Sequence, residues 1–256
     1  MAAGGDWSGK IFRYCERGGD AAFWAEPVNA LSNGAFIVAA LLAAAALARP
    51  SVRDAAGRGS RLADLPEWGL VLLVVAIGIG SFQFHTYATR WASVADTAPI
   101  GIFMLAYLGY ALRRFVGWGL IGALAGVALF IVAMRFAGEI PCAPGLLPIT
   151  RAGGHPCFNG SLGYLPALAA MLGIGGYLTA RGHAAGRLVL AAGLVFAVSF
   201  VFRTIDFEVC GLTRILGRAR GTHALWHLLN ALTLYLLLVA AIRHGAADCA
   251  RRPAVA

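Results

Sequence analysis

Two histidines four residues apart, His223 and His227, are the clearest sign of chemistry in this 256-residue sequence. On an α-helix this spacing stacks both imidazoles on one face, the arrangement by which a helix offers two nitrogens to one metal ion. A third histidine, His85, stands near the end of another apolar segment, one helical turn after Ser81. Three histidines and one open position form the ligand set of a catalytic zinc ion, so we expect zinc at His85, His223 and His227.

Asp96 and Ser81 are the polar residues expected beside this zinc site. Zinc lowers the pKa of a bound water toward neutrality and makes that water a nucleophile. Asp96 could accept its proton or hold the water in place, and Ser81 could donate a hydrogen bond to the oxyanion of a tetrahedral intermediate. Another interpretation is open here, because polar side chains in helix bundles also form networks that only fix helix packing.

The segments that carry these residues are long and apolar enough to cross a membrane. Hydrophobic residues make up 59% of the chain and charged residues only 13%, whereas soluble domains are near a quarter charged, so the composition predicts lipid as the solvent. Backbone groups in lipid must bond within their own segment, which favours helices. Seven spans of about 20 residues are predicted, at about 28–48, 68–86, 94–112, 115–134, 161–180, 187–203 and 222–242.

These spans predict one all-α domain, a seven-transmembrane-helix bundle over residues 1–256, with a very short turn at Arg113-Arg114. Successive spans alternate in direction, so the end of the second and the starts of the third and seventh share the face where the N-terminus lies. The three histidines and Asp96 should therefore meet just beneath that face. The formal charge of +9 does not indicate nucleic-acid binding, because the basic residues stand singly or in pairs between apolar runs.

The cysteines predict which face lies outside the cytoplasm. Four of them fall on the N-terminal face, while Cys249 stands alone in the opposite tail: the four are Cys15, Cys142, Cys157 and Cys210. Four is the parity of two disulfides in an oxidising compartment, and three pairings are open. The simplest joins Cys142 to Cys157 within one loop and leaves Cys15 with Cys210. We therefore expect the N-terminus outside and the C-terminus in the cytoplasm; four unrelated buried thiols are the alternative.

Several short motifs follow one another along the chain. The first two are Tyr14-Cys15-Glu16 and Phe23-Trp24-Ala25-Glu26-Pro27-Val28-Asn29-Ala30-Leu31-Ser32-Asn33. The third is the spacing of Ser81, His85 and Asp96. The fourth places Asp206 and Cys210 ahead of His223-Ala224-Leu225-Trp226-His227. In this order, and with this number of spans, the sequence resembles the alkaline ceramidases and their bacterial relatives over nearly its whole length. A wider superfamily with progestin and adiponectin receptors shares the serine, histidine and aspartate pattern but lacks the Glu-Pro-Val-Asn opening.

The resemblance implies hydrolysis of the amide bond of ceramide-like lipids to a sphingoid base and a free fatty acid. It assigns zinc to the three histidines, catalysis to Ser81 and Asp96, and a disulfide to Cys15 and Cys210. With the cysteine argument, it implies a multi-pass protein of a bacterial inner membrane, whose active site lies near the periplasmic face. The expected partner is a membrane lipid substrate, with no nucleic acid and no obligatory protein partner. The alternatives are a receptor-like or other lipid-binding member without turnover, a metal transporter and a purely structural bundle.

Calcium is a further expectation, and it rests on an imperfect match. Eukaryotic members of the family bind calcium through an Asp-Trp-x-Glu-x-Asn run and a later glutamate, and the two glutamates correspond to Glu16 and Glu26. Arg13 stands in place of the aspartate and Gly18 in place of the asparagine, and the charge of an arginine opposes a bound cation. Asp20 is the nearest substitute, so a calcium site would use Glu16, Glu26 and Asp20. A buried hydrogen-bonding role for Glu26 is the alternative.

Overall fold

The computed structural model describes residues 6–57, 64–140 and 157–245. Seven helical segments in these ranges are long and apolar enough to cross a membrane, which confirms the predicted all-α fold. They are α1 (Pro27–Ser32) with α2 (Gly34–Ala48), α4 (Leu65–Tyr87), α5 (Arg90–Arg114), α6 (Leu120–Glu139), η3 (Leu162–Tyr164) with α7 (Leu165–Ala180), α8 (Ala185–Thr204) and α9 (His223–His244). Shorter elements are α3 (Pro50–Ala55), η2 (Cys157–Gly160) and the hairpin of β1 (Arg214–Ile215) and β2 (Arg218–Ala219).

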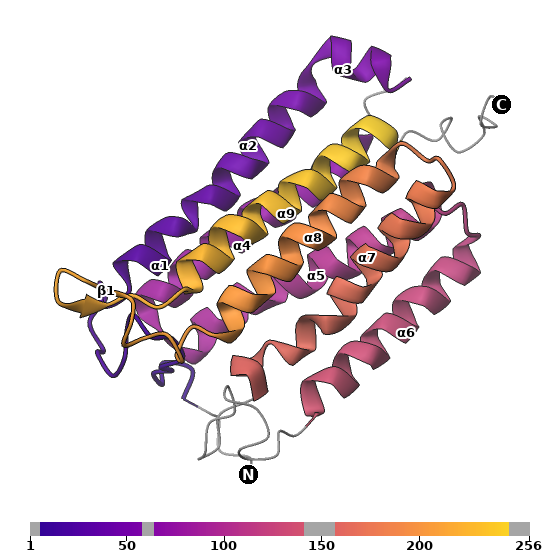
Figure 1. Cartoon of the computed structure of the whole chain (residues 1–256). Helices are drawn as coiled ribbons and strands as arrows, with labels where there is room; N and C mark the ends of the chain where they lie inside the picture. Colours follow the sequence, from indigo (N-terminus) through magenta and orange to yellow (C-terminus); the bar gives the residue numbers. More distant parts are fainter. Residues whose placement is uncertain (1–5, 58–63, 141–156, 246–256) are drawn as a thin grey trace.

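The helices form one elongated bundle in which α9 lies between α2 and α8, in front of α4 (Figure 1). Helix α9 packs against α2, α4 and α8, and it is the most deeply buried of the seven spans. Helix α6 packs at the edge of the bundle, beside α5 and α7. Polar side chains on α9 therefore face other helices, where they can find partners, and not lipid tails.

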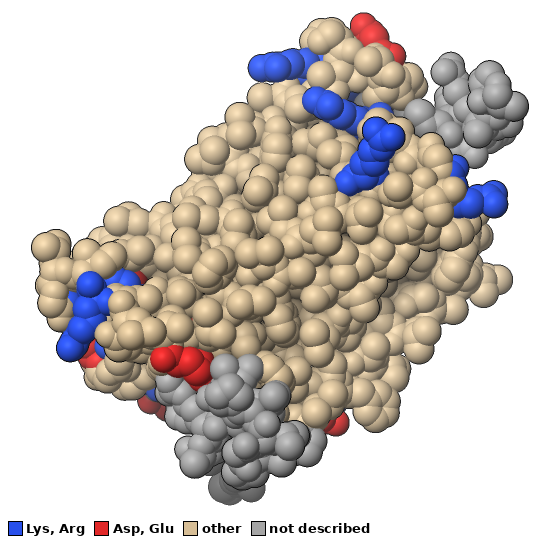
Figure 2. All heavy atoms as spheres, in the orientation of Figure 1, with Lys and Arg blue, Asp and Glu red and all other residues tan. Residues whose placement is uncertain are grey.

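Charged side chains gather at the two ends of the molecule, and Figure 2 shows a broad uncharged surface between them on the face that it presents. Large apolar side chains such as Leu41, Leu72 and Leu129 are exposed on the helices that form this middle region. In water such a surface would be unfavourable, but hydrocarbon is its natural solvent. The distribution of charge is that of an integral multi-pass membrane protein.

The turn between α5 and α6 differs from its predicted position. The sequence predicts a turn at Arg113-Arg114, but α5 includes both arginines and the turn comprises residues 115–119. The amides of Phe115 and Val116 both donate to the carbonyl of Ala111, and Gly117 takes a φ of +83° that favours glycine. Three apolar residues, Phe115, Val116 and Trp118, thus belong to the turn, and hydropathy cannot distinguish them from residues of a helix.

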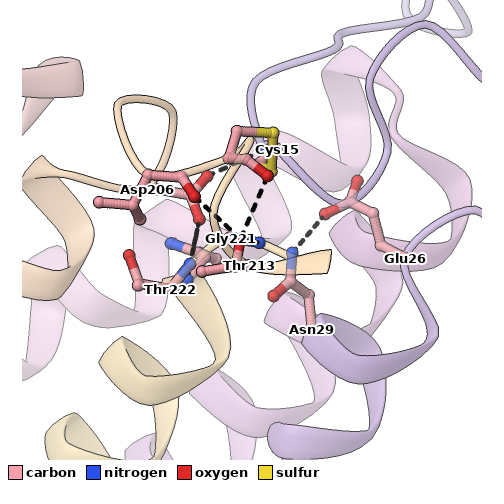
Figure 3. Close-up of a disulfide and its surroundings, with 10 residues drawn as sticks. Cys15, Glu26, Asn29, Asp206, Thr213, Gly221 and Thr222 are labelled. Atoms are coloured by element: carbon pink, nitrogen blue, oxygen red, sulfur yellow. Dashed lines mark hydrogen bonds between the residues drawn. A yellow bond between two sulfur atoms is a disulfide. The ribbon is translucent and has the colours of Figure 1, made fainter. Parts of the chain in front are cut away.

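A disulfide joins Cys15 in the N-terminal segment to Cys210 in the loop before α9, as predicted (Figure 3). Their Cα atoms are 5.6 Å apart. Cys157 is also disulfide-bonded, but its expected partner Cys142 lies outside the described residues, as does Cys249. The described disulfide fixes the N-terminal segment over the end of the bundle where α9 begins.

Helices α4 and α5 approach each other closely at Gly80. A Cβ atom at this position would lie 2.0 Å from the carbonyl oxygen of Ala95, so a side chain here would force the two backbones apart. The neighbours of these two residues in sequence are Ser81 and Asp96. The glycine therefore permits the helix contact that brings those two polar side chains together.

We expect Gly80→Ala to separate α4 from α5 and to destabilise the protein by about 1–3 kcal/mol, the usual effect of inserting a group into a packed site. The same change at Gly69 in the same helix is the matched control, because a Cβ atom there would meet no atom within 4 Å. Alanine also favours helix over glycine, so Gly69→Ala should be neutral or slightly stabilising. Thermal unfolding of both variants in detergent measures the difference, and equal melting temperatures would contradict the packing argument.

Candidate metal centre

His85, from the end of α4, meets His223 and His227, from the start of α9, at one end of the bundle. One nitrogen from each ring lies within 4.8 Å of those from the other two, and the ring centroids are between 4.5 and 5.1 Å apart. All three side chains are buried. Among the described residues, no other group of three or more His, Cys, Asp or Glu side chains comes together in this way.

The three nitrogens fit a metal ion. Two of them, Nε2 of His85 and Nδ1 of His223, are buried without any hydrogen-bond partner. A buried polar atom without a partner costs about 1–3 kcal/mol, and such atoms are rare in native proteins. A metal ion held by the imidazoles would satisfy both atoms and would use the ligand type that zinc prefers.

The orientation of His85 is set by Glu26. The Oε2 atom of Glu26 accepts a hydrogen bond of 2.6 Å from Nδ1 of His85 and another of 3.0 Å from the side chain of Asn29. Burial alone would raise the pKa of Glu26, but its contacts with His85, Asn29 and Arg17 outweigh burial and hold the pKa below its ordinary value. A carboxylate at Nδ1 leaves Nε2 of His85 free for the metal, the usual arrangement of histidine ligands.

Arg17 holds Glu26 in turn, and no pattern in the sequence predicts this role. Its guanidinium is buried and donates to the other oxygen of Glu26. It also donates to two carbonyls of its own segment and to the carbonyls of His85 and Thr86 at the end of α4. One buried cation therefore ties the N-terminal segment to the carboxylate that orients His85.

His227 is oriented by Ser32. The hydroxyl of Ser32 donates to the carbonyl of Asn29 (2.8 Å), and its oxygen lies 2.8 Å from Nδ1 of His227. Because the one hydroxyl proton points to Asn29, Nδ1 of His227 must donate, which leaves Nε2 as the free nitrogen. The opening segment, from Glu26 to Asn33, thus supplies a hydrogen-bond partner to two of the three histidines.

His223 is positioned by the first turn of α9. Asp206 accepts hydrogen bonds from the amides of Thr222 (2.7 Å) and His223 (2.9 Å), and its other oxygen accepts from the amide of Cys15 (2.9 Å) (Figure 3). Burial raises the pKa of Asp206, and the three N–H groups oppose that shift. Gly221 has a φ of +66°, and a Cβ atom there would lie 2.1 Å from Asp206. This cap and the disulfide together fix the place where His223 enters the centre.

Asp96 and Ser81 line the same cavity as His223 and His227. Both side chains are buried, and the hydroxyl of Ser81 hydrogen-bonds the carboxylate of Asp96, which also lies within electrostatic range of His85. The residues that the sequence predicts for zinc and for catalysis are therefore brought to one place. The hydroxyl proton of Ser81 is directed to Asp96, so Ser81 orients the carboxylate in this arrangement.

The three carboxylates considered for calcium do not face a common position. Glu26 contacts His85, as described above, and Glu16 accepts from two amides at the start of α1 and pairs with Arg220 at 2.6 Å. Asp20 accepts from an amide of its own loop and lies 4.0 Å from Arg218. Each carboxylate thus already has amide or arginine partners, and Glu26 has the hydrogen-bonding role that was the alternative to calcium.

We expect Glu26→Gln to weaken zinc binding by about 10- to 100-fold, the usual effect of losing an outer-shell partner of a histidine ligand. Glu16→Gln is the matched control, because Glu16 lies in the same region but has no contact with the histidines. Competition with a fluorescent zinc chelator measures both affinities. If the two variants lost zinc affinity equally, or neither lost any, the orienting role of Glu26 would be wrong.

No protein-family model matches this chain, and no curated protein sequence matches it. The resemblance to alkaline ceramidases therefore stays a prediction.

Proposed function

We propose that this chain is a zinc-dependent amidohydrolase within the membrane, which cleaves the amide bond of ceramide-like lipids to a sphingoid base and a free fatty acid. One observation carries the proposal. The three buried histidines come together, and two of their nitrogens have no partner. His223 and His227 share a cavity with Asp96 and Ser81, and this cavity adjoins a long apolar one. A metal, a carboxylate and an apolar channel are what hydrolysis of a long-chain amide requires.

The apolar cavity has a volume of about 740 Å³, including the space at its open side. Ile77, Ile100, Tyr164 and Asn230 line both cavities and so mark where they join. Helix α5 forms one wall and α7, α8 and α9 form another, as far as Leu237, ten residues beyond His227 on α9. Ten residues of helix are about 15 Å long, so the cavity suits an acyl chain whose amide lies at the histidines.

The chemistry follows from what the side chains can bind and move. A bound zinc ion would activate water and polarise the amide carbonyl. Asp96, held by Ser81, can accept the proton of the water that adds to the carbonyl carbon. When the carbon–nitrogen bond breaks, Asp96 can pass that proton to the departing amine and return to its ionised form.

The test of the proposal is hydrolysis by the purified chain. Incubation with ceramide in detergent micelles should release sphingoid base and fatty acid in equal amounts, measured by mass spectrometry. Chelation of zinc should stop the release and added zinc should restore it. Binding of ceramide without turnover, in protein with full zinc content, would favour the receptor-like alternative and contradict the proposal.

We also propose that the end of the bundle with the metal centre lies outside the cytoplasm, at the periplasmic face of a bacterial inner membrane. The Cys15–Cys210 disulfide supports this orientation, because such bonds persist in oxidising compartments. Leu216, in the hairpin at this end, is 93% exposed. In Leu216→Cys, a membrane-impermeant maleimide should label the new thiol in intact cells, and labelling only after permeabilisation would reverse the orientation.

A further inference from the structure

The cavity at the metal centre contains an arginine to which the hydrolytic steps described above assign no role. Arg203, at the end of α8, is 9% exposed and lines the cavity together with Asp96 and the α9 histidines. Its guanidinium lies 5.1 Å from the ring centre of Tyr164 and 5.6 Å from that of Trp226, which stands between His223 and His227 in sequence. A cation is thus held beside the metal ligands at the end of a membrane-spanning helix, where a buried charge is costly and is by default a candidate for function.

The hydrogen bonds of Arg203 leave part of its guanidinium unused. Nη1 donates to the carbonyl of Asn159 (2.7 Å) and to the hydroxyl of Ser161 (3.1 Å), and the hydroxyl of Tyr164 is also within bonding reach. Nε, however, is buried without a partner. Within the described residues, no carboxylate lies within ion-pairing distance of this arginine. If Arg203 only anchored the loop before α7, the two hydrogen bonds of Nη1 would be sufficient. The unpartnered Nε would then have no use.

Arg13 adds a second positive charge to the same cavity. It is exposed, lines the cavity from the N-terminal segment, and lies within electrostatic range of Asp96 and Tyr164. The lining therefore carries two guanidinium groups against the single carboxylate of Asp96, before any metal cation is counted. Such a lining attracts an anion, and arginine in particular binds oxyanions through two parallel N–H donors.

The position of the two arginines indicates which part of a lipid they would meet. Arg203 ends α8 at the end of the bundle where α9 begins, and Arg13 belongs to the segment that covers that end. The acyl chain would occupy the apolar cavity on the opposite side of the histidines. A group bound by the arginines is thus on the headgroup side of the amide.

We propose that Arg203 and Arg13 bind an oxyanion on the headgroup of the substrate, so that the preferred substrate is an N-acyl lipid with a phosphate-type group next to its amide. This inference rests on the proposed amidohydrolase function and narrows its substrate class. The fatty-acid product also carries an oxyanion, a carboxylate, and is the other source of the same chemistry.

Binding measurements on the zinc-loaded full-length chain distinguish these cases. The probes are ceramide, ceramide 1-phosphate and free palmitate in neutral detergent micelles, each displacing a fluorescent acyl lipid at 4 °C. Ceramide 1-phosphate should bind about 10- to 100-fold more tightly than ceramide, as expected for charge-assisted hydrogen bonds. A higher salt concentration should reduce this difference in affinity, because Arg13 is exposed to solvent and salt screens its attraction for the phosphate.

Variants assign the preference to the two arginines. Arg203→Gln should remove most of the difference between the phosphorylated and the neutral lipid, and Arg203→Lys should keep a smaller part of it because lysine lacks the paired donors. Arg13→Gln changes an exposed residue, so it tests the proposal even if Arg203 variants fold poorly. Arg218→Gln, in the exposed hairpin outside the cavity lining, is the matched control and should bind both lipids as the parent does.

Three results would overturn the inference. The first is that the parent binds ceramide and ceramide 1-phosphate with equal affinity. The second is that Arg13→Gln and Arg203→Lys, each tested singly, both keep the full preference for ceramide 1-phosphate. The third is a dependence on the arginines for palmitate alone, which would assign them to the product carboxylate. Hydrolysis is measured in parallel to separate this inference from the proposed amidohydrolase function. Cleavage of ceramide with no preference for the phosphorylated lipid contradicts only the inference about the arginines. Selective binding of the phosphorylated lipid without any cleavage contradicts only the amidohydrolase function.

Discussion

Replacement of His223 or His227 by alanine is expected to remove most of the metal from a protein that otherwise purifies with about one zinc ion per chain. The two rings and His85 offer nitrogens within 4.8 Å of one another. Removal of one of three ligands leaves too few for a tight tetrahedral site, so the loss of affinity should exceed the 10- to 100-fold expected for outer-shell changes. Elemental analysis after gel filtration measures the zinc content of each variant.

The control for this experiment is His244→Ala. His244 ends the same helix at the opposite end of the bundle, so its replacement changes a histidine of α9 without touching the centre. Its zinc content should equal that of the parent. Full zinc occupancy in both His223→Ala and His227→Ala would mean that the histidines form a packing network and that the metal assignment is wrong.

The membrane fold could be predicted from sequence because hydropathy and helix length are properties of each segment alone. All seven predicted spans overlap a helix of the structure. Their ends are less accurate, because caps depend on individual hydrogen bonds. Thr89, for example, caps α5 by accepting from the amide of Ala92, and the helix begins at Arg90, four residues before the predicted start of that span.

The histidines and Asp96 could be predicted because spacing and topology determine their place. A separation of four residues puts His223 and His227 on one face of any helix, and alternation of direction brings His85 to the same end. The contacts that orient them could not be predicted in this way. Arg17 and Ser32 reach the histidines only through the path of the N-terminal segment over the bundle, which no local pattern specifies.

The positions of the buried arginines could not be predicted from the sequence either. Composition favours an interfacial position for every arginine of a membrane protein, with its charge in water. Arg17 and Arg203 are instead buried, because backbone carbonyls and a carboxylate surround the first, and aromatic rings and a loop surround the second. Such surroundings are assembled from segments distant in sequence, so the functional candidates among the arginines emerge only from the structure.

Asp96→Asn is expected to separate chemistry from metal binding. Asparagine keeps the size of the side chain and an oxygen that can accept a hydrogen bond from Ser81, but it cannot take a proton from water. We therefore expect the zinc content and melting temperature to stay close to those of the parent, while hydrolysis of ceramide falls by roughly 10² or more, the scale of general-base catalysis. Initial rates measured by mass spectrometry on zinc-matched protein give this factor.

Two variants complete the test of Asp96. Ser81→Ala should have a smaller effect, because it removes the group that orients the carboxylate and leaves the proton acceptor in place. Glu139→Gln, at the exposed end of α6 where Glu139 pairs with Arg135, should hydrolyse as the parent does. If Asp96 served only helix packing, Asp96→Asn would lower the yield of folded protein without a specific loss of turnover. Hydrolysis at the parent rate by Asp96→Asn with zinc bound would show that another group accepts the proton, and the mechanism proposed for this site would then be wrong.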